Sequence, residues 1–235
     1  MVSTESIMKA GLLAAVCLLA ISAAPSWAKP QCSASAGPGV DWTECDKKLI
    51  ILSGSDFKGA TLVGTDFTST DLRETNLMAA DLEKATLVRA SLAGSHAEGA
   101  KFDRIEAYRT NFSALRAKGA TFASADVQRS NFSNSNLVDV DFTKADLGRA
   151  DFTGADITGA RFPLANLSRA DLSGAKFSGP LDFSNAFLFL TRFEGVDLSA
   201  ATGLQQWQID MSCGDEKTKL PEGLAVPASW PCAFD

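Results

Sequence analysis

Large apolar residues recur at every fifth position along most of this chain. One frame holds from Leu52 to Phe177 without insertion or deletion. The units Ala145–Arg149, Ala150–Gly154 and Ala155–Gly159 show it most plainly, as a small residue, an aspartate, a large apolar residue and two polar, charged or glycine positions. This period matches neither the helix period of about 3.6 residues nor the two-residue alternation of a strand. It predicts a backbone that turns a corner every five residues.

The unit resembles that of the pentapeptide-repeat family, usually written A-(D/N)-L-X-X, over about 150 of the 235 residues. The resemblance implies an all-β fold, a right-handed quadrilateral parallel β-helix with four pentapeptides per coil. About 30 pentapeptides in seven to eight coils are expected. The third residue of each unit, called the centre below, and the small first residue are expected to point inward.

Two features of the inward positions support this frame. Ile105 and Leu115 stand where small residues are expected, and the centres that follow them are Ala107 and Ala117, so the total volume is roughly kept. In addition, every second centre is phenylalanine over a long stretch: Phe102, Phe112, Phe122, Phe132, Phe142, Phe152 and Phe162. Alternate centres fall on opposite sides of a four-sided coil, so two phenylalanine ladders should face each other. Each buried ring contributes about 1.5–3 kcal/mol.

The pattern divides the chain into four segments. Residues 1–28 are interpreted as a signal peptide, 29–49 as an N-terminal cap, 50–200 as the repeat and 201–235 as a C-terminal cap. Within the repeat, the frame slips by one residue near 179–182, at Gly179-Pro180. Proline suits a bulge or a kinked corner because it cannot donate to a ladder.

The N-terminal segment predicts export. Lys9 precedes an apolar run over residues 10–24, and Ser26-Trp27-Ala28 offers small residues at a cleavage site. Lipidation at Cys17 and an uncleaved anchor helix remain as alternatives. The expected destination is the periplasm, or the thylakoid lumen in a photosynthetic host, with no membrane contact after cleavage.

Four cysteines remain after cleavage, an even number that is typical of disulfides in exported chains. Cys32 and Cys45 precede the repeat, and Cys213 and Cys232 follow it. A stack of seven to eight coils is roughly 35 Å long, whereas a disulfide needs Cα atoms within about 7 Å. The expected pairs are therefore Cys32–Cys45 and Cys213–Cys232, one staple at each end.

The sequence offers little for catalysis. The chain has a single histidine, His96, and a single tyrosine, Tyr108, and it contains no metal-ligand spacing and no glycine-rich phosphate loop. We expect no enzyme activity, no cofactor and no metal. The net charge of −6 also disfavours direct binding to nucleic acid.

Positions 20 residues apart should stack on one side of the rod, and five arginines share one such column: Arg89, Arg109, Arg129, Arg149 and Arg169. Two interpretations stay open. Glu106, Asp126 and Asp146 stand on the same side and could neutralise the arginines in a solvated lattice. Otherwise the arginines form a stripe that binds an anionic partner.

An apolar cluster lies near the end of the repeat. After the frame slip Leu188 is a centre, so Phe187, Phe189 and Leu190 fall outside the core positions. Exposed apolar side chains in a group are unusual on a soluble surface. Either the C-terminal tail covers them, or they form a homodimer or docking surface in the C-terminal coils.

These observations favour a non-catalytic exported rod that binds or scaffolds an unknown envelope protein. The alternative, implied by the family, is a cytoplasmic DNA mimic that binds topoisomerases. That role needs long continuous negative charge. Only one side is clearly acidic, with Asp71, Glu74, Asp151 and Asp171 against Arg73.

Overall fold

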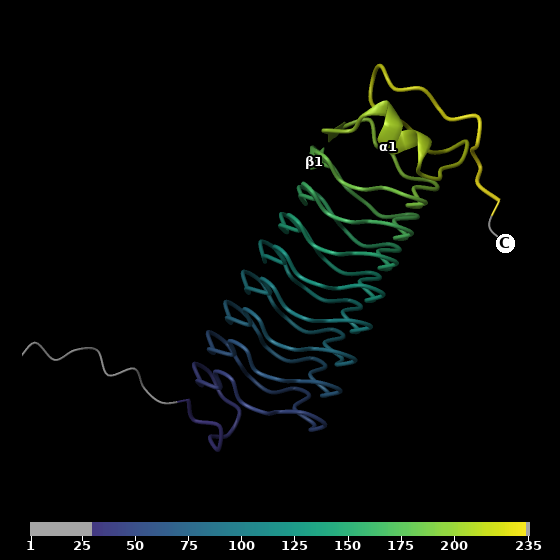
Figure 1. Cartoon of the computed structure of the whole chain (residues 1–235). Helices are drawn as coiled ribbons and strands as arrows, with labels where there is room; N and C mark the ends of the chain where they lie inside the picture. The colour runs from purple at the N-terminus through teal and green to yellow at the C-terminus, as the bar shows by residue number, and fades with distance from the viewer. Residues whose placement is uncertain (1–29, 234–235) are drawn as a thin grey trace, which may run out of the picture.

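The computed structural model shows an elongated stack of coils that runs from the N-terminal to the C-terminal end (Figure 1). It describes residues 30–233, so the expected signal peptide at 1–28 lies outside the described residues. The regular elements are short: strands β1 (Leu181–Asp182) and β2 (Ala201–Thr202), paired in parallel, and helix α1 (Gln206–Asp210). No helix within residues 30–233 is long and apolar enough to cross a membrane.

Each coil contains four five-residue units. Parallel bridges join residues 20 apart, as in the series Asp126, Asp146 and Asn166. The backbone N–H of Leu147 donates to the carbonyl of Asn166 in the next coil at 2.7 Å, and that of Asp146 donates to Ala125 in the previous coil at 2.8 Å. Coils therefore satisfy one another's backbone groups along the whole rod.

The corner between two units is a tight turn. The N–H of Ala150 donates to the carbonyl of Leu147 at 2.9 Å, and Arg149 between them has a left-handed φ of 59°. Positive φ at the third residue of a turn is the mark of type II geometry. The carboxylate of Asp146 accepts the N–H of Gly148 at 3.0 Å. This bond explains why the second position of the unit is so often Asp or Asn.

Phenylalanine rings fill the middle of the rod. Rings one coil apart, such as Phe112 and Phe132, stack with centroids 4.8 Å apart, and rings on opposite sides, such as Phe122 and Phe132, meet edge to face at 5.7 Å. Both geometries are favourable for aromatic pairs. Ile105 and Leu115 are fully buried at positions that otherwise hold small residues.

The frame slip is visible in the pairing register. Before it, bridge partners are 20 residues apart, whereas Arg161 pairs with Asp182, 21 residues on. Gly179 has a φ of 99° in the irregular segment that absorbs the extra residue. The centres Phe183 and Leu188 that follow are again fully buried.

The repeating coil begins earlier than the boundary at residue 50 that we placed from the sequence. The bridge series starts at Asp41, and Trp42 occupies a buried centre. The next centre is Lys47, whose ammonium lies 3.6 Å from the centroid of the Trp42 ring and donates to the carbonyl of Cys32 at 2.7 Å. Residues 41–49 therefore form part of a coil rather than a separate cap. The apolar pattern did not predict this coil because the residue at its second centre, Lys47, is charged.

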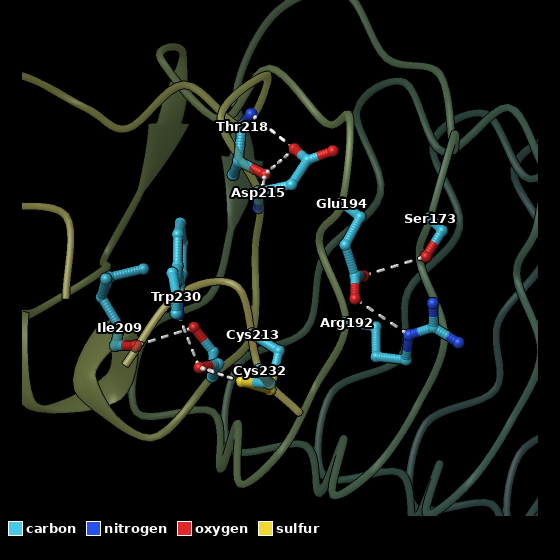
Figure 2. The surroundings of a disulfide bond; sticks show 10 residues. Ser173, Arg192, Glu194, Ile209, Cys213, Asp215, Thr218, Trp230 and Cys232 are labelled. Carbon is cyan, nitrogen blue, oxygen red and sulfur yellow. Dashed lines mark hydrogen bonds and ion pairs between the residues drawn. A yellow bond between two sulfur atoms is a disulfide. The ribbon is translucent and has the colours of Figure 1, made fainter. Parts of the chain in front are cut away.

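Two disulfides, Cys32–Cys45 and Cys213–Cys232, join the terminal segments to the coils. Figure 2 shows the second one, beside which the Trp230 indole N–H donates to the carbonyl of Ser212 at 2.7 Å. Helix α1 lies at the same end of the rod (Figure 1). The buried Gln208 amide donates from there to the carbonyls of Phe183 at 3.1 Å and Ala186 at 2.8 Å.

Candidate functional site

The five arginines of the 20-residue series lie in stacked turns along one corner of the rod. All have a left-handed backbone, with φ between 55° and 59°. The N–H of Arg129 donates to the Gly148 carbonyl and that of Arg149 to the Ser168 carbonyl, each in the next coil. All five are exposed. We call Arg89, Arg109, Arg129, Arg149 and Arg169 the arginine edge.

The acid–arginine lattice contains no direct ion pair of an edge arginine among the described residues. Other arginines pair with acids, as Arg104 does with Glu83 at 2.9 Å, but no member of the arginine edge has such a pair within residues 30–233. Two of the three nearby carboxylates have other partners. Asp126 accepts from the Gln128 amide at 3.2 Å, and Asp146 from the Asn166 amide at 3.1 Å.

The aromatic ring of Tyr108 lies near the guanidinium groups of two arginines of the edge. Its ring centroid lies 5.3 Å from the Arg109 guanidinium and 6.0 Å from that of Arg129. Such contacts are weakly attractive at exposed sites and leave the guanidinium N–H groups free to donate. The arginines of the edge are thus positioned without a direct ion pair to a carboxylate among the described residues.

A hollow of about 230 Å³ lies between three arginines of the edge, lined by Gln128, Arg129, Gly148, Arg149, Asn166, Ser168 and Arg169. Gly148 lacks a side chain, and a Cβ there would lie 3.2 Å from the Asp146 carboxylate. Guanidinium groups present N–H donors in a fork that matches carboxylate and phosphate oxygens. The hollow is therefore suited to an anionic group.

The apolar cluster continues the arginine edge at its C-terminal end. Phe187 pairs with Asn166, and the Arg169 N–H donates to the carbonyl of Phe189 at 2.8 Å. Leu190 takes the turn position that follows Arg169 in the column. The two phenylalanine side chains are 46% and 42% exposed, with nearly parallel rings at a centroid distance of 6.3 Å.

The described part of the C-terminal tail does not bury these rings, so the interpretation that it covers them is wrong for residues up to 233. The tail instead folds over the end of the rod. The Trp230 ring lies so close to Gly214 that a Cβ on that glycine would meet it at 2.3 Å. The Gln206 amide donates to the carbonyl of Ala225 at 2.9 Å.

A second apolar group, which the sequence reading missed, lies at the opposite end of the same corner. Leu49 is 79% and Ile51 80% exposed, with Ile50 between them. Leu49 occupies the turn position two coils before Arg89, with Ser69 between. The sequence evidence for this group is the run Leu49-Ile50-Ile51, in which no residue is a centre. It was overlooked because it spans the expected boundary between the N-terminal cap and the repeat.

The described residues show no arrangement for acid–base or metal chemistry. His96 is exposed, and no group of three or more His, Cys, Asp or Glu residues between 30 and 233 could hold a metal ion. Hydrogen bonding by Arg73 lowers the pKa of Asp71 to about 2, and Lys219 does the same for the pKa of Asp197. Such carboxylates stay ionised at neutral pH and make poor general acids.

The repeat matches two family models. The model of pentapeptide repeats with eight copies matches residues 50–87 and 75–113, and the model of the pentapeptide repeat region matches residues 100–172. The chain belongs to the pentapeptide-repeat family. The predicted β-helix of this family is therefore confirmed, together with two disulfides and very little α-helix.

Solved structures of pentapeptide-repeat proteins resemble the chain. HetL from the cyanobacterium Nostoc, a protein involved in heterocyst differentiation regulation, is 23% identical over 80% of this chain and 85% of its own, with a TM-score of 0.32. QnrB1, a plasmid-mediated fluoroquinolone resistance protein, is 21% identical over 79% and 83%, with a TM-score of 0.42. Similarity at this level supports no functional argument. No curated protein matches the sequence significantly.

Proposed function

We propose that this pentapeptide-repeat protein is a non-catalytic, exported rod that binds an anionic partner through the arginine edge. The proposal includes a right-handed β-helix of seven to eight coils with a stapled segment at each end. It also includes removal of the segment 1–28 on export to the periplasm or thylakoid lumen, because Lys9, the apolar run and Ser26-Trp27-Ala28 follow signal-peptide order.

The observation that supports the binding role is the unpaired state of the arginine edge. The chain carries a net charge of −6, and its other described arginines lie beside carboxylates. Five arginines in one column, about 4.8 Å apart, repel one another unless an anion is present. An anionic partner therefore gains from all of them together, and the rigid coils keep them in place for it.

The edge also separates this proposal from a DNA-mimicking role. A DNA mimic presents continuous negative charge along its length, and the arginine edge interrupts such a surface over five coils. A homodimer through Phe187 and Phe189 remains compatible with the arginine role, because the apolar cluster lies beyond the last arginine.

The test is a cross-linked pull-down of the tagged full-length protein from intact cells. The variant Arg109→Gln/Arg129→Gln/Arg149→Gln removes three charges from the edge, and Arg104→Gln/Arg116→Gln/Arg161→Gln removes three ion-paired charges elsewhere as a matched control. We expect the wild type and the control to recover an anionic envelope component that the edge variant loses. Equal recovery by all three proteins would contradict the proposal.

A further inference from the structure

The arginine edge has an exposed apolar group at each of its ends. At the N-terminal end are Leu49 and Ile51, which are almost entirely exposed, and at the C-terminal end are Phe187 and Phe189, which are nearly half exposed. The turn column that contains the arginines begins with Leu49 and continues to Leu190. Along a length of roughly 34 Å, this corner of the rod therefore presents first an apolar group, then the arginines, and then a second apolar group.

We infer that this corner lies on an anionic lipid surface, with the arginines among the phosphates and the apolar groups below the headgroups. The inference rests on the proposed function and names the chemistry of the anionic partner. It departs from the sequence expectation that the exported protein makes no membrane contact.

Charge complementarity is the first argument. Basic residues beside an anionic bilayer each contribute about 1 kcal/mol, and the guanidinium fork matches phosphate oxygens. The hollow between Arg129, Arg149 and Arg169 has room for one phosphate-bearing headgroup, and Ser168 and Asn166 add polar groups to its wall. The chain as a whole has a net charge of −6, so attraction to an anionic surface depends on the arginines of this corner, which form no ion pair within residues 30–233.

The apolar groups favour a lipid surface over an acidic protein. Phe187 and Phe189 stack on each other and present their rings outward, which suits insertion between headgroups. Leu49 stands in the same turn column as the arginines, and Ile51 lies beside it in the neighbouring column that continues to Asp71, so apolar side chains are present at both ends of the corner. An acidic protein needs a matching pocket for each apolar group, whereas a bilayer accepts both without specific shape.

Vesicle flotation tests the inference with the tagged full-length protein, as purified from the producing cells. Vesicles of phosphatidylcholine, alone or mixed with phosphatidylglycerol, are the probe. All variants carry the same N-terminal segment, and its contribution is measured on the neutral vesicles. We expect binding that depends on phosphatidylglycerol and weakens as salt is added.

Two variants and a control locate the contact. Arg109→Gln/Arg129→Gln/Arg149→Gln should weaken binding to the anionic vesicles about a hundredfold, and Phe187→Ser/Phe189→Ser should weaken it at least about tenfold. The control Arg104→Gln/Arg116→Gln/Arg161→Gln should bind like the wild type. In a Phe187→Trp variant, brominated lipid should quench the added part of the tryptophan emission.

The outcomes separate this inference from the proposed function. If the wild type does not bind anionic vesicles, or if the control and the edge variant lose binding equally, the lipid inference is wrong. If vesicle binding fails while the edge variant still loses a cross-linked acidic protein from cells, the proposed function stands with a protein partner. Absence of quenching in the Phe187→Trp variant would overturn the insertion of the aromatic end.

Discussion

The last residue of nearly every repeat unit has a left-handed backbone whatever its type. Glycine fills this position in some units, but Ala114, Arg149 and Leu164 have positive φ as well. A non-glycine residue in this conformation costs roughly 1–2 kcal/mol. The hydrogen bonds between stacked coils impose this turn conformation, so the backbone of a non-glycine residue at the corner is locally strained.

Replacing Ala114 by glycine should therefore stabilise the rod. Ala114 has a φ of 54°, and its change to glycine removes the Cβ conflict without removing a charge. We expect the free energy of unfolding to rise by about 1 kcal/mol, measured by urea denaturation. Ala123→Gly is the control at a turn position without positive φ, and it should lower stability by about 0.5–1 kcal/mol. Changes of the same sign would contradict the argument.

A second prediction at this scale concerns pH. Arg73 donates to both carboxylate oxygens of Asp71, at 2.8 and 2.7 Å, and holds the pKa of Asp71 at about 2. In the unfolded chain this pKa is about 3.9. The lowered pKa in the folded state means that the pair stabilises the protein above about pH 4. This contribution is lost as the pH falls through about 2.

The variant Arg73→Gln should thus lower stability only slightly at pH 7, because the pair is exposed and screened by solvent. The difference from the wild type should vanish near pH 2. Arg149→Gln, which loses no ion pair, should show no such pH-dependent difference. Urea midpoints at the two pH values measure both variants, and a pH-independent effect of Arg73→Gln would exclude the ion pair as its cause.

At the scale of elements, the end of the stack depends on helix α1. A coil without a successor exposes backbone carbonyls, and the buried Gln208 amide bonds to those of Phe183 and Ala186. Gln208→Leu removes both bonds where water has little access, so stability should fall by about 1–3 kcal/mol. Gln206→Leu is the matched control, because its bonds are solvent-exposed. A thermal melt that shows equal losses would contradict the capping role of Gln208.

The period of five in the sequence was sufficient to predict the coils, the inward phenylalanines and the shift to 21-residue pairing. It failed where one side chain broke the pattern. Lys47 sits at a centre because its ammonium lies against Trp42 and bonds to the carbonyl of Cys32, contacts that only the folded N-terminal segment provides. The sequence also did not predict that the arginines of the edge lack ion pairs, because Asp126 and Asp146 accept hydrogen bonds from neighbouring side-chain amides instead.

At the scale of the whole molecule, residues that are 20 apart stack on the same side of the rod up to the frame slip at residues 179–182. Deletion of residues 115–134 removes one complete coil and leaves Arg149 directly after Arg109 in the column. Deletion of residues 115–124 removes half a coil. It keeps the alternation of the phenylalanine ladders, yet moves Arg129, Arg149 and Arg169 to the opposite corner. Both deletions preserve every inward position, so both proteins should fold.

These two proteins separate a continuous edge from the mere presence of arginines. The half-coil deletion retains all five arginines but divides them, with Arg89 and Arg109 on the original corner and the other three beside Phe187 and Phe189 on the opposite corner. The larger group lacks two arginines, so we expect anionic-vesicle binding to fall about thirtyfold. The full-coil deletion retains one arginine fewer, in a continuous column, and should lose only about fivefold. Circular dichroism and thermal melts check that both are folded. Equal binding by the two would mean that net charge, rather than the aligned edge, holds the rod on its partner.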